Sequence, residues 1–251
     1  MIPFGKIGIK HFNMADFTIE EIQRYSRQFM LEEIGAEGQI KIKHAKVLVV
    51  GAGGLGCPVL QYLAAAGVGT IGIVDFDKVE IHNLHRQILF GTDDIGKSKA
   101  STAAKKILSS NSNVNPVVFD VLLDESNAEN IISQFDIVVD GSDNFQTRYL
   151  VNDVCVILHK PLVYGSILKF EGQIAVFNFK GGKNLRDIFP EAPNPEDVPS
   201  CSQNGVLGIV PGMIGMMLCD LCLKIILDFK IDMNTLMLIN LKNYHFQKLV
   251  F

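Results

Sequence analysis

A hydrophobic run that breaks into glycines, V-L-V-V-G-A-G-G-L-G from Val47 to Gly56, constrains the fold of this chain more than any other stretch. The apolar run predicts a buried strand, and the residues after the glycines predict a helix. Gly51 permits a tight turn, Gly53 lets a phosphate approach the backbone, and Gly56 lets helix and strand pack closely. The stretch therefore predicts a bound nucleotide, but it does not distinguish NAD from ATP.

Strands and helices alternate through the residues that follow, which predicts a parallel sheet covered on both faces. The strands are expected at 46–50, 70–75, 116–121, 135–140 and 161–164, with helices between them at 58–66, 97–109, 128–134 and 147–158. After Gly165 the pattern changes, and three further strand-like runs follow at 171–179, 236–241 and 244–251. We therefore expect an α/β, Rossmann-like fold whose parallel sheet is extended by antiparallel C-terminal strands.

The organisation along the chain favours a single domain over residues 1–251. Residues 1–15 are expected to be a loose lead-in, and 17–42 a helical region that opens with a capping box from Thr18 to Glu21. The nucleotide-binding half is expected at 46–165, a crossover loop at 180–204, and a C-terminal helix with two strands at 205–251.

Composition excludes several classes of protein. A net charge of −4 argues against a nucleic-acid binder, which needs a basic surface. Five scattered cysteines and an N-terminus without a secretory signal favour a reduced, cytoplasmic protein. The most apolar stretch, 205–227, contains Pro211, Asp220 and Lys224, so we expect a buried core helix and no membrane span.

A dense polar cluster follows the second strand, in V-D-F-D-K-V-E-I-H-N-L-H-R-Q. Asp75 lies at the end of that strand, where a carboxylate accepts hydrogen bonds from ribose hydroxyls. A dinucleotide site needs little more, whereas Arg86 and Lys99 could both reach a triphosphate running from the glycine turn. The cluster therefore favours ATP over NAD. Its members are Asp75, Asp77, Asn83, Arg86, Gln87 and, further on, Lys99.

A literal P-loop pattern, G-x-x-x-x-G-K-S, spans Gly91 to Ser98. Asp93 and Asp94 would place two carboxylates beside the phosphates that such a loop binds, and no long strand precedes it. We interpret the stretch as the start of the helix that carries Lys99.

The fourth expected strand, 135–140, runs into I-V-V-D-G-S-D-N, so that carboxylates follow it at the carboxyl edge of the sheet. Mg²⁺ takes oxygen ligands, usually one or two carboxylates beside substrate phosphates, and Asp143 fits that role. Asn144 is also a plausible cap for the next helix, which is compatible with a nearby metal. Asp140 is the remaining carboxylate of the stretch.

Taken in order, these motifs resemble the ThiF/MoeB-like adenylyltransferases, which are relatives of the ubiquitin-activating enzymes. The resemblance covers about residues 20–228 and rests on R-Y-S-R-Q from Arg24, G-x-G-G-x-G, D-x-D with N-L-x-R-Q, G-K-x-K and D-x-x-D-N. It implies a cytoplasmic homodimer that uses ATP and Mg²⁺ to adenylate the C-terminal glycine of a ubiquitin-like sulfur carrier with a Gly-Gly terminus, for thiamine or molybdopterin synthesis. Pyrophosphate is released, and the sulfur donor is a separate protein.

The resemblance also implies roles for individual residues. Asp75 would bind ribose, Asp143 would hold Mg²⁺, and Arg27 would reach the ATP, from the neighbouring subunit. Phosphate contacts would come from Asn83, Arg86 and Lys99. The whole implied ATP site consists of Gly51, Gly53, Gly54, Gly56, Asp75, Asp77, Asn83, Arg86, Gln87, Lys99, Asp143 and Asn144, with Arg27, Arg86, Lys99 and Asp143 acting in catalysis.

Cys201, in P-S-C-S-Q-N-G-V, occupies the position of a family cysteine that forms a covalent bond to the carrier in some members and is dispensable in others. No Lys, Arg or His within ten residues lowers the pKa of its thiol, so both roles stay open.

Many family members carry two C-x-x-C pairs that bind a structural zinc. Here Asn184 and Asp187 stand where the first pair belongs, and no pair follows near Phe251, so we expect no zinc site. Cys219 and Cys222 form a C-x-x-C inside an apolar helix, where core packing is the expected role.

Two other functions remain as alternatives. An NAD-dependent oxidoreductase explains the glycines and Asp75 but gives no role to Arg86, Lys99 and Asp143. The same fold could also adenylate a peptide or another small carboxylate.

Overall fold

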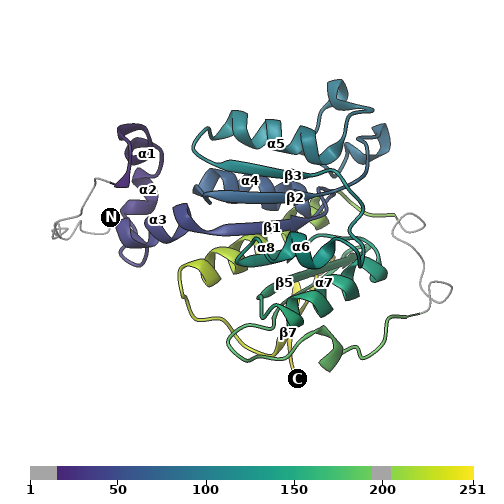
Figure 1. Cartoon of the computed structure of the whole chain (residues 1–251). Coiled ribbons are helices and arrows are strands. Elements are labelled where there is room, and N and C mark those ends of the chain that lie inside the picture. The colour runs from purple at the N-terminus through teal and green to yellow at the C-terminus, as the bar shows by residue number, and fades with distance from the viewer. Residues whose placement is uncertain (1–15, 194–204) are drawn as a thin grey trace.

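An eight-stranded sheet organises the molecule, and its strand order is β3-β2-β1-β4-β5-β6-β7-β8. A computed structural model describes residues 16–193 and 205–251 (Figure 1). The strands are β1 (Lys46–Val50), β2 (Thr70–Val74), β3 (Asn115–Phe119), β4 (Ile137–Asp140), β5 (Leu162–Leu168), β6 (Glu171–Phe177), β7 (Thr235–Asn240) and β8 (His245–Val250).

The first five strands pair in parallel, with β1 in the centre. Val50, the last residue of β1, is level with Val74 of β2 and with Asp140 of β4. The carboxyl ends of these three strands therefore meet at one edge, where open α/β sheets bind ligands. β6, β7 and β8 then extend the sheet in antiparallel fashion. The expected α/β fold is confirmed, including its antiparallel extension.

Helices cover both faces of the sheet because alternate residues of each inner strand point to opposite sides. Val47 and Val49 pack with one group of helices, and Leu48 and Val50 with the other. The first group consists of α4 (Gly56–Ala66), α5 (Lys99–Ser110) and α8 (Ile209–Ile226); the second consists of α6 (Ala128–Ile132) and α7 (Phe145–Ile157).

The region expected to be helical over 17–42 is broken into three helices: α1 (Ile19–Arg24), α2 (Ser26–Phe29) and α3 (Gly35–His44). The Thr18–Glu21 capping box is formed as expected. Tyr25 interrupts the run, because its buried ring lies against Gly67 at the end of α4 and its hydroxyl accepts a hydrogen bond from Asn111 Nδ2 at 2.8 Å. Gly35, at a φ of 54°, makes the later change of direction.

Helix α8 is the only helix of the described part of the chain long and apolar enough to cross a membrane. It lies behind the sheet in Figure 1 and packs against α4, β5 and β6. Asp220 and Lys224 pair with each other at 2.6 Å along its more exposed side. This packing is that of a core helix, as the interrupted apolar pattern indicates.

Candidate functional site

The glycine turn joins β1 to α4 at the carboxyl edge of the sheet. A Cβ atom on Gly56 would lie 1.9 Å from the carbonyl oxygen of Gly51, so only glycine fits there. Gly53 differs, because the nearest atom to a Cβ on it would be Gln87 Nε2 at 3.8 Å. The packing of the protein therefore requires glycine at Gly56, whereas the backbone at Gly53 is open to a ligand.

Asp75 follows β2 and is tied directly to this turn. Its Oδ2 accepts a hydrogen bond from Ala52 N at 2.7 Å, and its Oδ1 accepts one from Asp77 N at 2.9 Å. Burial raises the pKa of the Asp75 carboxyl above its usual range, although Lys99 and the two backbone N–H groups oppose the shift. Each oxygen keeps acceptor capacity beyond these bonds, as a ribose contact requires.

Lys99 lies at the start of α5 and points its ammonium group back toward the end of β2. Its side chain is only 7% exposed, and Nζ lies 2.8 Å from Asp77 Oδ2. The backbone N–H of Lys99 also donates to the carbonyl of Asp77 at 2.9 Å. A buried cation held by one carboxylate still has two ammonium protons to donate to other acceptors, such as phosphate oxygens.

The loop after β2 brings two more predicted residues to the turn. Gln87 is buried, its Nε2 faces Gly53, and its Oε1 has no hydrogen-bond partner among the described residues. Arg86 Cγ lies 3.5 Å from the Cβ position of Gly54, and its Nη1 donates to His82 O at 3.0 Å. A buried acceptor without a protein partner is the kind of group that a ligand satisfies.

Asn83 has a local structural role in addition to any contact with a ligand. It ends the short 3-10 helix η2 (Ile81–Asn83), and its Oδ1 accepts a hydrogen bond from Glu80 N at 3.1 Å. The side chain therefore holds the loop that carries Arg86 and Gln87.

Of the polar residues at the end of β4, some are buried within the protein and others are exposed to solvent. Asp140 is fully buried and lies 3.2 Å from Arg148 Nε, whereas Asp143 is exposed and makes no hydrogen bond or ion pair within the described residues. Asn144 Oδ1 accepts a hydrogen bond from Thr147 N at 2.8 Å and so caps α7, as its alternative interpretation predicted. Among these residues, only Asp143 has a carboxylate uncommitted to the protein.

The P-loop pattern forms the segment that leads into α5, and its last residue, Ser98, caps that helix. The Asp94 carboxylate occupies the position that a phosphate would take in a P-loop. Its Oδ2 accepts a hydrogen bond from Gly91 N at 2.9 Å and lies 2.8 Å from Lys106 Nζ. Ser98 then caps α5 by accepting from Ser101 N. The short helix η3 (Thr92–Asp94) forms in between.

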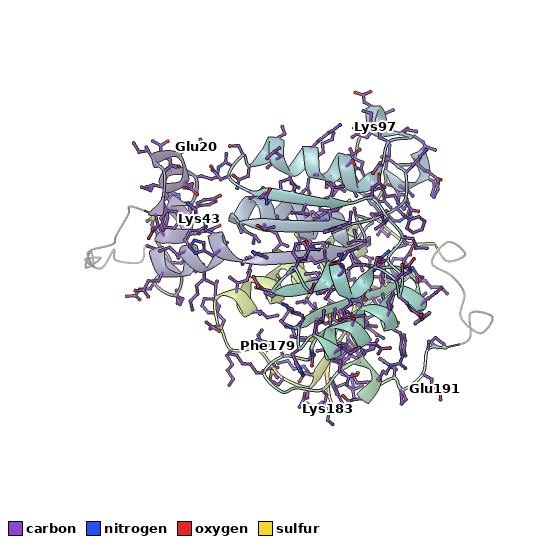
Figure 2. All side chains as sticks on the ribbon, viewed as in Figure 1. Glu20, Lys43, Lys97, Phe179, Lys183 and Glu191 are labelled. Carbon is purple, nitrogen blue, oxygen red and sulfur yellow. The ribbon has the colours of Figure 1, made fainter. Side chains whose placement is uncertain are left out.

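Arg27 lies far from the glycine turn of its own chain. Gln28, next to it in α2, donates to Ala66 O at the C-terminal end of α4, while the turn precedes the N-terminal end of that helix. Figure 2 shows the same separation, with Glu20 and Lys43 at the amino end of the sheet and Lys97 at the carboxyl end. Within one chain the structure does not bring Arg27 to the other predicted residues.

The residues proposed for or against a metal or covalent role lie elsewhere. Asn184 and Asp187 cap the 3-10 helix η4 (Leu185–Asp187), with Asn184 N donating to Asp187 Oδ2 at 2.7 Å. Cys219 and Cys222 are buried in α8, and burial raises the pKa of Cys219 to about 12. Cys201 lies outside the described residues. Within those residues no three His, Cys, Asp or Glu side chains gather as a metal site.

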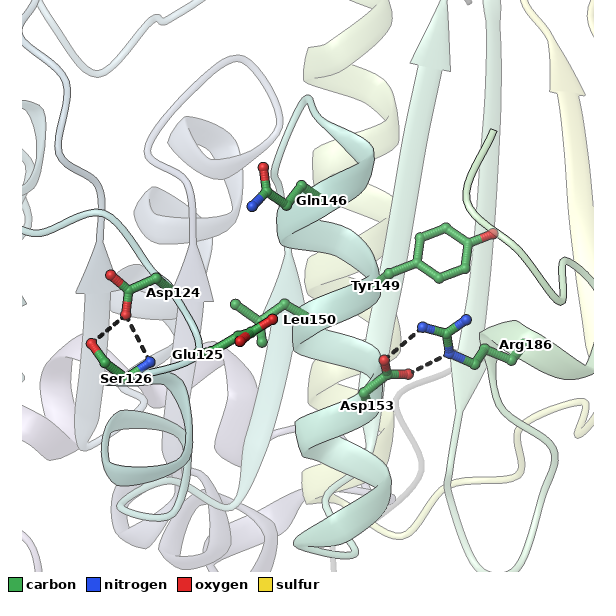
Figure 3. A pocket seen from close by; sticks show the side chains of 8 residues that line it. All are labelled: Asp124, Glu125, Ser126, Gln146, Tyr149, Leu150, Asp153 and Arg186. Carbon is green, nitrogen blue, oxygen red and sulfur yellow. Dashed lines mark hydrogen bonds and ion pairs between the residues drawn. The ribbon is translucent and has the colours of Figure 1, made fainter. Parts of the chain in front are cut away.

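Two features escaped the sequence patterns because they join side chains that belong to different secondary-structure elements. One is the contact of Arg148 with Asp140, for which the only signal was a charged residue on a buried face of α7. The other is an open groove of about 650 Å³ along α7, in which Arg186 pairs with Asp153 beside Tyr149 (Figure 3). Two acidic residues, two neutral polar residues and one leucine complete its wall: Asp124, Glu125, Ser126, Gln146 and Leu150.

Comparison with known proteins matches the chain to a protein family. The model of the ThiF family matches residues 25–250. The sulfur carrier protein adenylyltransferase of Thermus thermophilus is 49% identical over 216 residues, which are 84% of this chain and 80% of that protein. The adenylyltransferase and sulfurtransferase MOCS3 of Xenopus laevis is 48% identical over 217 residues, 86% of this chain but 48% of that protein. The chain thus spans about half the length of this larger relative.

Solved structures share the fold at low sequence identity. PaaA superposes with a TM-score of 0.81 at 21% identity, covering 96% of this chain and 76% of that one. MccB of E. coli gives a TM-score of 0.79 at 22% identity, covering 93% and 71%. At this identity the likeness concerns the fold.

Proposed function

The chain belongs to the ThiF family, and on that premise we propose that it transfers AMP from ATP to the C-terminal glycine carboxylate of a ubiquitin-like sulfur carrier protein. Two relatives support this reaction: the sulfur carrier protein adenylyltransferase of Thermus thermophilus and the probable molybdopterin-synthase adenylyltransferase of Porphyra purpurea. The carrier would end in Gly-Gly and supply sulfur for thiamine or molybdenum cofactor synthesis.

One observation supports a triphosphate most strongly: the open backbone at Gly53 follows Ala52, whose N–H is bonded to Asp75, and two cations lie at the same edge of the sheet. Lys99 is buried beside Asp77, and Arg86 contacts the position of Gly54. Two cations next to a glycine turn suit the charge of a triphosphate. A dinucleotide site would use Asp75 and leave both cations without a function.

The proposed reaction needs alignment and charge more than it needs a base. A glycine carboxylate is already ionised at neutral pH, and one of its oxygens attacks the α-phosphorus of ATP. The bond from that phosphorus to the bridging oxygen breaks, and pyrophosphate leaves with the bond's electron pair. The products are the acyl adenylate of the carrier and pyrophosphate.

Each side chain of the site would contribute to one part of this step. Gly51, Gly53, Gly54 and Gly56 form the floor under the phosphates, and Asp75 fixes the ribose. Arg86 and Lys99, with Asn83 and Gln87, hold the phosphates and stabilise charge that develops on the leaving pyrophosphate.

Asp143 is the residue that best fits a magnesium ion. It is an exposed carboxylate, uncommitted within the described residues, and Gly141 just before it packs against Gly51 of the glycine turn. An oxygen donor of this kind, next to Asn144 in the motif, matches the ligand preference of Mg²⁺. When bound, the ion would neutralise phosphate charge.

Three further elements of the proposal concern partners. Arg27 lies far from the turn of its own chain, so we place it in the ATP site of a second copy in a homodimer. Cys201 would either accept the carrier as a covalent adduct or be dispensable. The sulfur itself would come from a separate donor protein.

ATP–pyrophosphate exchange tests the proposed function. The chain is incubated with ATP, labelled pyrophosphate and candidate carriers ending in Gly-Gly, and label entering ATP is measured. We expect exchange with one carrier and none with a carrier that lacks its last two glycines. No exchange with any carrier, together with tight binding of NAD, would overturn the proposal in favour of an oxidoreductase. Exchange with a short peptide alone would favour the other alternative.

A further inference from the structure

The turn after β4 lies directly against the glycine turn. Gly141 N donates a hydrogen bond to Val50 O at 2.8 Å, and a Cβ on Gly51 would lie 2.9 Å from Gly141 O. The two turns are therefore in backbone contact, and Asp143 is two residues beyond that contact. The position of Asp143 relative to the nucleotide floor depends on how firmly the intervening residue, Ser142, is held.

A single buried arginine holds Ser142 from the carbonyl side. Arg148, 5% exposed, donates from Nη2 to Ser142 O at 2.8 Å and to Gly165 O at 3.1 Å. Its Nη1 donates to the Tyr164 hydroxyl at 3.2 Å, and its guanidinium lies 4.9 Å from the centre of that ring. One planar group thus connects α7, the β4 turn and β5.

Asp140 holds Ser142 from the amide side. Its Oδ1 accepts from Ser142 N at 2.9 Å and from Ser142 Oγ at 2.5 Å, while its Oδ2 faces Arg148 Nε at 3.2 Å. The N–H, the carbonyl and the hydroxyl of Ser142 are all fixed by one ion pair. Asn144 caps α7 on the other side of Asp143, so the backbone of Asp143 is anchored at both neighbours.

We propose that Arg148 is a positioning residue, which sets the Asp143 carboxylate against the glycine turn by clamping Ser142 through its carbonyl and through Asp140. This inference rests on the proposed function, in which Asp143 is a metal ligand. Packing alone does not demand such a pair, because apolar side chains of similar volume often stabilise a core as well as a buried ion pair does. A directional clamp needs the fork of donors that arginine provides.

Arg148→Lys separates this role from simple charge compensation. Lysine keeps a cation near Asp140, but its single ammonium cannot reach Ser142 O, Gly165 O and Tyr164 together. The measurement is binding of Mn²⁺, used as a probe for Mg²⁺, by electron paramagnetic resonance of the free ion with a non-hydrolysable ATP analogue. We expect about tenfold weaker Mn²⁺ binding, since outer partners of metal ligands typically contribute that much. Binding of AMP without metal should stay within about twofold of wild type.

A double-mutant cycle with Asp143→Asn tests whether the effect passes through Asp143. If Arg148 acts only by positioning that carboxylate, Arg148→Lys should change Mn²⁺ binding no further in the Asp143→Asn background. Arg186→Lys is the matched control, because it makes the same change in a second Arg–Asp pair, whose aspartate lies on α7 and which does not contact the turn. It should leave Mn²⁺ binding unchanged.

Ser142→Ala gives a second route to the answer if Arg148→Lys does not fold. It removes the hydroxyl that bonds Asp140 and leaves the ion pair intact, so we expect about fivefold weaker Mn²⁺ binding from the loss of one hydrogen bond. Wild-type Mn²⁺ affinity in Arg148→Lys overturns the positioning role; where that variant does not fold, wild-type affinity in Ser142→Ala does so. The role is also overturned if Arg148→Lys weakens Mn²⁺ binding as much in the Asp143→Asn background as in the wild-type background. If the wild-type chain binds no Mn²⁺ in the presence of the ATP analogue, the proposed function is contradicted as well.

Discussion

Helix α7 takes part in two arginine–aspartate pairs that share their chemistry and differ in their surroundings. Arg148 and Asp140 have side chains that are 6% and 0% exposed, whereas those of Arg186 and Asp153 are 44% and 40% exposed. The exposed pair has the better geometry, with two contacts of 2.7 Å. The buried pair holds a turn at the carboxyl edge, and the exposed pair lines a groove. Burial, more than distance, therefore decides what each pair does for the molecule.

The largest effect should follow from breaking the buried pair. Asp140→Ala leaves the Arg148 guanidinium buried without its carboxylate, which typically costs about 3–5 kcal/mol of unfolding free energy. Urea denaturation followed by circular dichroism measures the change. A loss below about 1 kcal/mol would show that the buried pair contributes no more to stability than an exposed pair does.

The next effect concerns Asp143, three residues from Asp140 but exposed. Asp143→Asn should lower ATP–pyrophosphate exchange about 10²-fold, because removing one group that stabilises transition-state charge typically costs that much. The free energy of unfolding should not change. Asp120→Asn, at another exposed carboxylate past the end of β3, is the control and should retain exchange. Near wild-type exchange in Asp143→Asn would show that another residue holds the metal ion.

Asp75 offers a third contrast, since it is buried at the same edge with backbone N–H groups as its bonded partners. Its raised folded pKa means that its contribution to stability is present below the ordinary Asp pKa and is lost as pH rises through the folded value. The unfolding free energy of Asp75→Asn, compared with that of wild type, should therefore be higher at pH 7 than at pH 4. Nucleotide binding should weaken about tenfold through lost ribose contacts. A flat difference between the two pH values would contradict the pKa direction.

The smallest effect should come from the exposed pair. Asp153→Asn should cost less than about 1 kcal/mol, and added salt should reduce that cost. The hydrogen bonds of Arg186 lower the pKa of Asp153, so its contribution is present above the ordinary Asp pKa and is lost as pH falls through the lowered folded value. Thermal unfolding of wild type and variant at pH 7 and pH 3 measures this. A cost near that of Asp140→Ala would contradict the role assigned to burial.

Local patterns predicted the features that depend on residues close in sequence. The glycine turn, the strand of Lys46–Val50 and the cap at Asn144 follow from residue types within a few positions, and the structure has them where the sequence indicates. The breaks at Tyr25 and Gly35 did not follow, because Tyr25 leaves the helix to reach Gly67 and Asn111.

The site shows the same division. Asp75, Asp77 and Lys99 lie together as their positions at a strand end and a helix start predicted. The clamp of Arg148 joins α7 to β4 and β5, and the groove joins α7 to η4, so neither follows from the pattern of a single helix or strand. Which residues hold a turn in place is a tertiary property.

The central position of β1 has a consequence for how the chain folds. β1 is the first strand made, and it pairs with β2 soon afterwards, but its other neighbour is β4, which comes much later in the sequence. Until β4 docks, the apolar edge of β1 has no partner, and such unpaired edges favour misassembly in folding intermediates. The nucleotide floor needs contacts from both neighbours of β1. The site would therefore form only after β4 has docked, and nascent chains that stop short of β4 should depend on chaperones.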